Sequence, residues 1–143
     1  HLRNLKEDVG MWKLRNEWEN MQYIVKNMTP KDALILIPYD TTMCGFRMFS
    51  EREIIVSYRD CGIIGFDYKA VVEWDKRIKD VEPFRVIMKS PIKDAVKNAI
   101  FKYKVNYIVF MKYYQPPEDN GVLEFVHRND IFSLYKVRSN PVY

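Results

Sequence analysis

The stretch "ALILIP" at residues 33–38 is the strongest indicator of the fold. A short, continuous apolar run is typical of a strand covered on both faces, as in a parallel sheet between layers of helices. "EIIVSY" at residues 53–58 has the same character. The two runs predict two buried strands joined by one connection, and this connection contains "GFRMFSERE" at residues 45–53.

Helical periodicity surrounds these strands. From residue 4 to residue 28 the apolar side chains recur at steps of three and four, which predicts a long amphipathic helix that ends before Thr29–Pro30. Two further helices are expected, over residues 66–80 and from about Pro91 onward. The intervening stretch, residues 83–91, fits either a short strand or an extended link. The apolar stripe of the first helix comprises Met11, Leu14, Trp18, Met21, Val25 and Met28.

The last third of the chain predicts three strands. "VNYIVFMKY" at 105–113 follows the third helix directly, and the runs at 122–128 and 131–137 are separated by only two residues, as in an antiparallel pair. Alternating strands and helices predict an α/β fold: a small Rossmann-like three-layer sandwich with a mainly parallel sheet, a C-terminal antiparallel hairpin and a long N-terminal helix. We expect a lead-in helix over residues 1–28 and a single domain over residues 29–143.

Composition narrows the class of protein. A chain of 143 residues with 48% hydrophobic residues has enough apolar side chains for one folded domain. The net charge of +4 is spread along the chain, and this argues against nucleic-acid binding. No run approaches the ~20 apolar residues of a membrane span. Because the chain begins at His1 instead of methionine, we expect it to be a segment of a longer protein.

The two cysteines, Cys44 and Cys61, match no zinc-binding or thioredoxin-type spacing. Each follows one of the first two predicted strands, so both are expected near one end of the sheet. They are either two unpaired buried thiols or a disulfide, which requires an oxidising compartment.

The sequence contains no complete catalytic set. It lacks a glycine-rich dinucleotide turn, a P-loop and a nucleophile elbow, and its two histidines, His1 and His127, give no metal-binding pattern. A small enzyme with Asp40 or Cys44 as its reactive group would have no evident partner base. We therefore predict no catalytic residue, no metal and no cofactor.

The best candidate binding segment is the loop Tyr39–Arg52, because ligands of open α/β sheets bind at the carboxyl ends of the strands. Arg47 and Arg52 could clamp a phosphate or carboxylate, and Tyr39 and Asp40 could bond sugar hydroxyls. The alternative, which we favour, is structural. In that reading Phe46 and Phe49 anchor a helical turn, and the arginines pair with Asp40, Glu51 or Asp75 to fix the loop.

Trp74 and Arg77 on the second predicted helix raise the same question. A tryptophan at apolar spacing is more often a core residue than a stacking platform. Arg77, three residues further on, could reach over the same face and pair with an acid.

Several phrases together resemble a known group. "WENMQYIVKNMTPKDALILIP" (18–38), "GFRMFSER" (45–52), "VVEWDKRI" (71–78), "KYKVNYIVF" (102–110) and "NDIFSLYKV" (129–137) are similar to the C-terminal soluble domain of GT-C-like bacterial and archaeal multi-pass membrane proteins, glycosyltransferase relatives included. The recurring positions of that group fall on Arg47, Ser50, Arg52, Trp74 and Arg77. No role is established for them.

The resemblance implies a non-catalytic, extracytoplasmic domain anchored through the membrane portion of the same polypeptide. The catalytic acids of such proteins lie upstream, between membrane helices. The implied partners are that membrane portion and a glycan or lipid-phosphate. The alternative is a free-standing small-molecule or sugar-phosphate binding module that uses the Tyr39–Arg52 loop.

Overall fold

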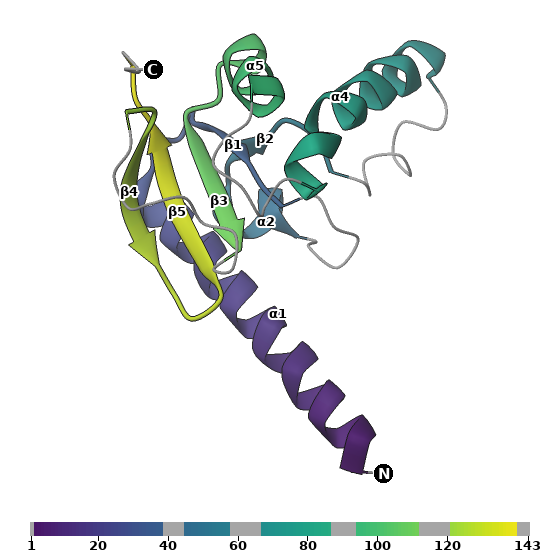
Figure 1. Cartoon of the computed structure of the whole chain (residues 1–143), viewed down its shortest axis with the longest axis vertical. Coiled ribbons are helices and arrows are strands. Elements are labelled where there is room, and N and C mark those ends of the chain that lie inside the picture. Colours follow the sequence, from purple (N-terminus) through teal and green to yellow (C-terminus); the bar gives the residue numbers. More distant parts are fainter. Residues whose placement is uncertain (1, 39–44, 58–66, 87–93, 112–120, 140–143) are drawn as a thin grey trace.

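The computed structural model describes residues 2–38, 45–57, 67–86, 94–111 and 121–139. These residues form an α/β fold with one five-stranded mixed sheet (Figure 1). In chain order the elements are α1 (Leu2–Met28), β1 (Leu34–Leu36), α2 (Phe46–Ser50), β2 (Glu53–Ile54), α4 (Tyr68–Val86), α5 (Asp94–Tyr103), β3 (Tyr107–Met111), β4 (Leu123–Arg128) and β5 (Phe132–Val137).

The sheet has the strand order β2-β1-β3-β5-β4. Strand β1 pairs in parallel with both β2 and β3, whereas β5 pairs antiparallel with β3 and with β4. The predicted C-terminal hairpin is therefore confirmed, but the sheet is evenly mixed and not mainly parallel. The reason is that β5 returns into the sheet beside β3, which adds a second antiparallel pairing.

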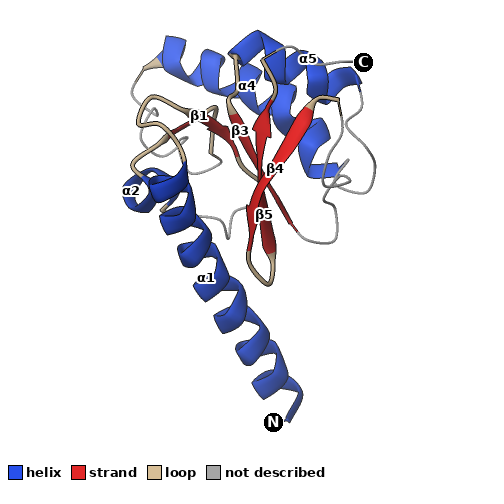
Figure 2. Ribbon diagram, turned by 90° about the vertical axis from the view of Figure 1, so that its left-hand side faces the viewer, coloured by secondary structure: helices blue, strands red, loops and turns tan. Residues whose placement is uncertain are grey.

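Each face of the sheet carries its own hydrophobic core. Side chains of successive strand residues point to opposite faces, so Ile35 and Ile37 belong to one core and Leu36 to the other. The first core contains Trp18, Met21 and Val25 of α1; the second contains Val81 of α4 and Ile100 of α5. Figure 2 shows α1 apart from α4 and α5. Burial on both faces explains why the β1 run is apolar throughout.

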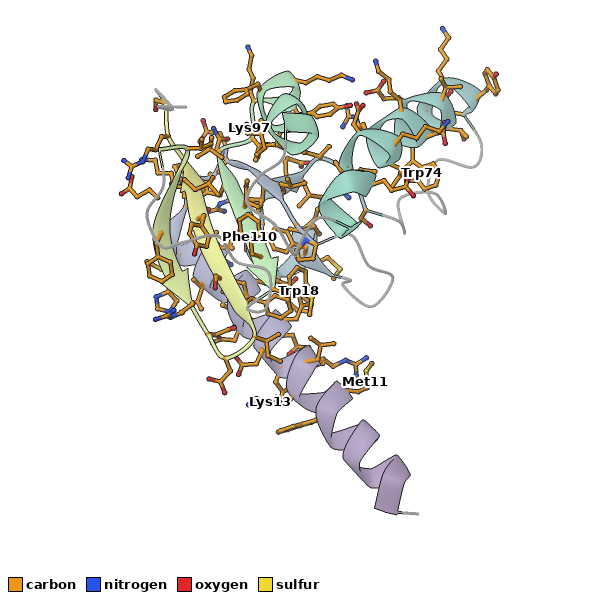
Figure 3. All side chains as sticks on the ribbon, in the orientation of Figure 1. Met11, Lys13, Trp18, Trp74, Lys97 and Phe110 are labelled. Carbon is orange, nitrogen blue, oxygen red and sulfur yellow. The ribbon has the colours of Figure 1, made fainter. Side chains whose placement is uncertain are left out.

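Only the middle of the predicted α1 stripe is buried. Trp18 is 3% exposed and packs against the rings of Phe46 and Phe132, with centroids 5.4 and 5.0 Å away. Met11 and Met28, at the two ends of the stripe, are 55% and 45% exposed. Helix α1 extends well past the sheet (Figures 1 and 3), so its first turns lie beyond the core.

Helix α4 is longer than its sequence pattern indicates. The Asp67 side chain caps its start by accepting a hydrogen bond from the backbone N–H of Lys69 at 2.9 Å. The helix then continues to Val86, through Pro83, so residues 83–86 are neither a strand nor an extended link. Proline removes one backbone donor from a helix, and α4 tolerates this loss in its final turn.

Trp18→Ala should destabilise the chain by about 3–5 kcal/mol, because it opens a cavity where three aromatic rings meet. Trp12 is 68% exposed on the same helix, so Trp12→Ala is the matched control and should change stability by less than about 0.5 kcal/mol. Urea unfolding of the two variants measures the difference. Equal losses would show that α1 does not pack on the sheet through Trp18.

Candidate functional site

The structure describes five of the predicted site residues, and all five contact the segment 50–57 around strand β2. Ser50 and Arg52 belong to this segment, Arg47 of α2 contacts it at Ile54, and Trp74 and Arg77 reach it from α4. The predictions for Tyr39, Asp40, Cys44 and Cys61 fall outside the described residues.

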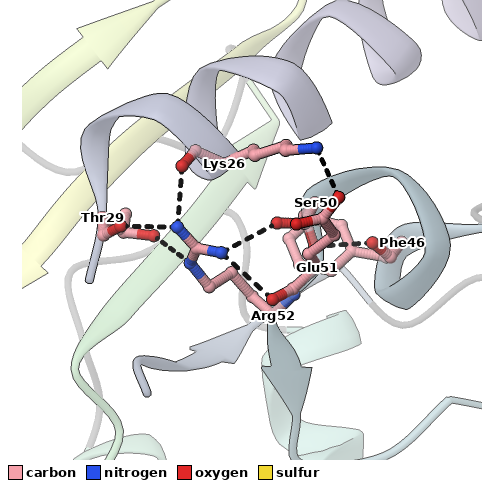
Figure 4. Close-up of polar contacts among 6 residues, drawn as sticks. All are labelled: Lys26, Thr29, Phe46, Ser50, Glu51 and Arg52. Atoms are coloured by element: carbon pink, nitrogen blue, oxygen red, sulfur yellow. Dashed lines mark hydrogen bonds and ion pairs between the residues drawn. The ribbon is translucent and has the colours of Figure 1, made fainter. Parts of the chain in front are cut away.

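The guanidinium of Arg52 occupies the C-terminal end of α1 (Figure 4). Its Nε donates to Thr29 Oγ1 at 3.0 Å, and one terminal nitrogen donates to the carbonyls of Lys26 and Thr29, both at 2.7 Å. The other terminal nitrogen donates to the carbonyls of Ser50 and Glu51 at 3.3 and 3.1 Å. An arginine has five N–H donors, so these five hydrogen bonds use all of them.

This arrangement follows from the way α1 ends. The last carbonyls of a helix lack helical partners and carry the negative end of its dipole. The backbone N–H and the hydroxyl of Thr29 both donate hydrogen bonds to the carbonyl of Val25, at 3.1 and 2.7 Å. Arg52 supplies donors and a positive charge to the carbonyls of Lys26 and Thr29. Because Arg52 is only 5% exposed, its charge is compensated by carbonyl oxygens within the fold.

Short helix α2 delivers Arg52 to this position. Gly45 precedes α2 with φ of 78°, and a Cβ at this residue would lie 3.0 Å from the Phe49 ring, so the site favours glycine. Ser50 Oγ donates to the carbonyl of Phe46 at 2.6 Å and accepts from the backbone N–H of Arg52 at 3.2 Å. The predicted helical turn is confirmed. Phe46 anchors it in the core, whereas Phe49 is 38% exposed.

An ion pair closes this junction on its exposed side. Lys26 Nζ donates to the carboxylate of Glu51. This hydrogen bond, together with the positive charges of Lys26, Lys31 and Arg52, lowers the pKa of Glu51 below its usual range. Glu51 was predicted as a possible partner of an arginine, but it is hydrogen-bonded to Lys26.

Arg47 is the more accessible of the two loop arginines. Its side chain is 38% exposed, its Nε lies 3.6 Å from Glu53 Oε2, and its terminal nitrogen lies 3.4 Å from the carbonyl of Ile54. These contacts are long compared with those of Arg52. Arg47 is therefore more accessible to a soluble anion than Arg52 is.

Trp74 and Arg77 bind the chain just after β2. Trp74 Nε1 donates to the carbonyl of Ser57 at 3.1 Å, and an Arg77 terminal nitrogen donates to the carbonyl of Ile55 at 3.1 Å. Among the described strands β2 lies at an edge of the sheet, and the carbonyls of Ile55 and Ser57, just beyond it, accept side-chain donors. Both predicted site residues thus stabilise the sheet edge.

A second polar cluster joins α4 to α5 beside Arg77. Arg77 Nε donates to Glu73 Oε1 at 2.8 Å, and its guanidinium lies 5.8 Å from the centre of the Tyr103 ring. Asp80 accepts hydrogen bonds from Lys102 and from the Tyr103 hydroxyl, and these bonds lower the pKa of Asp80. Burial and the bond to Asp80 raise the pKa of Tyr103.

An open pocket of about 260 Å³ lies elsewhere, at the amino-terminal ends of β1 and β3. Its polar lining consists of Asp32, Asn106, Lys136 and Ser139. Asn106 Oδ1 already accepts from the backbone N–H of Leu34 at 2.8 Å. Sequence reasoning missed this pocket, because its walls come from three segments that are far apart in the chain, residues 30–33, 106–107 and 136–139.

The described residues show neither a metal-binding cluster nor a helix suited to cross a membrane. No group of histidine, cysteine, aspartate and glutamate side chains there is arranged to hold a metal ion. In the same residues no helix has both the length and the apolar character needed to cross a membrane.

Comparison with protein families relates part of the chain to a known domain family. A family model described as a domain of unknown function (DUF6798) matches residues 16–81. The matched region runs from the second half of α1 into α4 and contains Arg47, Ser50, Arg52, Trp74 and Arg77. No curated protein matches the chain. This part of the chain is therefore similar to a domain family to which no activity is assigned.

Arg52→Met should destabilise the chain by about 2–4 kcal/mol, because buried carbonyls at the end of α1 lose charged donors. Arg52→Lys should lose nearly as much stability as Arg52→Met, since an ammonium cannot reproduce the planar five-donor fork of a guanidinium. The control is Arg47→Met, which removes the long contacts to Glu53 and to the carbonyl of Ile54 and should cost about 1 kcal/mol. Denaturant unfolding separates the cases. Similar losses for Arg47→Met and Arg52→Met would refute the special role of Arg52.

Asp80→Asn should cost roughly 1–2 kcal/mol at pH 7, because Lys102 and Tyr103 lose a charged acceptor. The folded pKa of Asp80 is lowered, so its contribution is complete above the unfolded value near 3.8 and disappears as the pH falls through the lower folded value. Unfolding curves at a series of pH values should show wild type and variant converging in acid. A gap that stays constant below pH 3.8 would contradict this assignment.

Proposed function

We propose that the chain is a non-catalytic, extracytoplasmic domain of a polytopic membrane protein, related to GT-C-like glycosyltransferases. Its role would be to pack on the membrane portion of the same polypeptide or to help that portion bind a glycan or lipid-phosphate acceptor. The proposal includes the fold type, which would be a small Rossmann-like three-layer domain. Helices on both faces of the sheet support it.

The projecting end of α1 carries this proposal. Met11 and Trp12 lie there with 55% and 68% of their surface exposed, although large apolar side chains are usually covered. A contact with another part of a larger assembly would cover them. Two contacts hold α1 against the turn between β4 and β5. Asn129 Nδ2 donates to the carbonyl of Glu17 at 2.7 Å, and Lys13 pairs with Asp130 at 3.0 Å.

The described candidate residues support a non-catalytic role. Arg52, Trp74 and Arg77 donate to backbone carbonyls, and Ser50 is bonded within α2. Hydrogen bonds of this kind stabilise the fold. They also argue against the alternative of a sugar-phosphate module, since Arg52 has no donor left for a ligand. Of the two loop arginines, Arg47 is the one that such a ligand could still reach.

The test is fractionation of the natural gene product that carries this segment, with an epitope tag after Tyr143. The tag should stay in membranes washed with alkaline carbonate, and protease added outside intact cells should remove it. The control is the 143-residue chain alone with the same tag, which the carbonate wash should release. A gene product found in the soluble fraction, or a tag cleaved only after lysis, would refute the proposal.

A further inference from the structure

Three neighbouring parts of the sheet form the pocket beside β1 and β3. Residues 30–33 lead into β1, residues 106–107 lie at the start of β3, and residues 136–139 lie at the end of β5. Because β3 lies between β1 and β5, the first and last of these segments flank the start of β3. Neighbouring strands are about 4.8 Å apart, so these two walls are separated by roughly 10 Å. The pocket of about 260 Å³ thus has a floor and two opposite walls.

Asn106 is held in place at the floor of this pocket. Its backbone N–H donates to the carbonyl of Leu34 at 2.9 Å, and its carbonyl accepts from the N–H of Val137 at 2.8 Å. Its side-chain Oδ1 accepts from the N–H of Leu34 at 2.8 Å. The amide nitrogen Nδ2 carries two further donors, and no acceptor for them is found among the described residues. A fixed side chain with unused donors therefore lies between the two walls.

The two walls carry opposite charges. Asp32 belongs to the wall that leads into β1, and Lys136 belongs to the wall formed by the end of β5. Within the described part of the chain, neither side chain has an ion-pair partner. Glu124 lies opposite Lys136 on β4, but its carboxylate is 3.9 Å from Arg138. A carboxylate and an ammonium group thus remain available on the two sides of the pocket.

This arrangement favours a ligand that carries both charges itself. A ligand carboxylate would pair with Lys136 and accept a hydrogen bond from Asn106 Nδ2, while a ligand ammonium group would donate to Asp32. A ligand with a single charge would leave one wall without a counter-charge. Tyr107, which is only 8% exposed, adds apolar surface at the floor for the remainder of the ligand.

We propose that this pocket binds a small zwitterion of the α-amino acid type, with its carboxylate toward Lys136 and its ammonium group toward Asp32. Both charged side chains are exposed at the rim. Exposed ion pairs contribute little free energy, so the dissociation constant should be on the order of 1 mM. The inference is independent of the proposed function, because it rests on the pocket residues alone.

The experiment is a titration of the isotope-labelled chain with L-leucine, followed by NMR through the Asn106 side-chain amide and the Val137 backbone N–H. Two derivatives test the charges separately, since L-leucinamide lacks the carboxylate and N-acetyl-L-leucine lacks the ammonium group. Each derivative should bind about fivefold more weakly than L-leucine, which is the loss expected when one exposed ion pair is removed. The ionic strength is kept constant throughout.

Two variants assign each charge to its wall. Lys136→Met should make L-leucine bind as weakly as L-leucinamide, and Asp32→Asn should make it bind as weakly as N-acetyl-L-leucine. The matched control is Lys69→Met, which removes an exposed lysine on α4 and should leave the titration unchanged. The melting temperature of each variant should equal that of the wild type, because no described residue pairs with Asp32 or Lys136.

Three results would overturn the inference. The first is an Asn106 amide signal that does not move up to the solubility limit of L-leucine. The second is equal binding of L-leucine and N-acetyl-L-leucine, which would reveal a simple anion site at Lys136. The third is an equal effect of Lys136→Met and Lys69→Met. None of them would affect the proposed function, which the fractionation of the gene product tests separately.

Discussion

The structure depends on a buried guanidinium that lies against the end of a helix. Arg52 joins α1 to the start of β2 with five hydrogen bonds, and every acceptor is an uncharged oxygen. Burying a charge is costly unless it is fully hydrogen-bonded. The dipole of α1 supplies the favourable potential here, and the planar fork supplies donors in several directions at once. The chain can therefore leave α1, form β1 and return to β2 within a small volume.

This junction also explains how a two-residue strand persists at a sheet edge. Arg52 holds β2 at its start, and Trp74 and Arg77 hold the chain that follows it. The opposite edge, β4, has a bulge between Phe125 and His127, and Glu124 and Arg128 are exposed on it. Bulges and charged side chains discourage pairing with another strand. The two edges are thus protected in different ways, one by side-chain caps and the other by irregularity and charge.

The pattern of apolar residues predicted the helices and strands better than the contacts between them. The apolar run at residues 33–38 and the stripe on α1 indicated a strand and a helix correctly, because burial on a sheet imposes periods that are visible in sequence. The pattern could not show where the sheet ends along α1, and Met11 of the apolar stripe is exposed. The second helix was predicted to end at residue 80, but α4 continues through Pro83 to Val86. The role of Arg52 was hidden, since its partners on α1 lie 23 and 26 residues away.

An arginine or tryptophan beside a strand gives the same sequence signal whether it binds a ligand or holds the backbone. The two roles differ in donors, because a binding arginine must keep some for its ligand, whereas Arg52 has used all five. The bonds of Arg52 have a further consequence, since they fix the C-terminal end of α1 while Asn129 holds its middle. The first turns of α1 are then set in direction relative to the sheet. Any surface that contacts Trp12 therefore also determines how the whole domain is oriented.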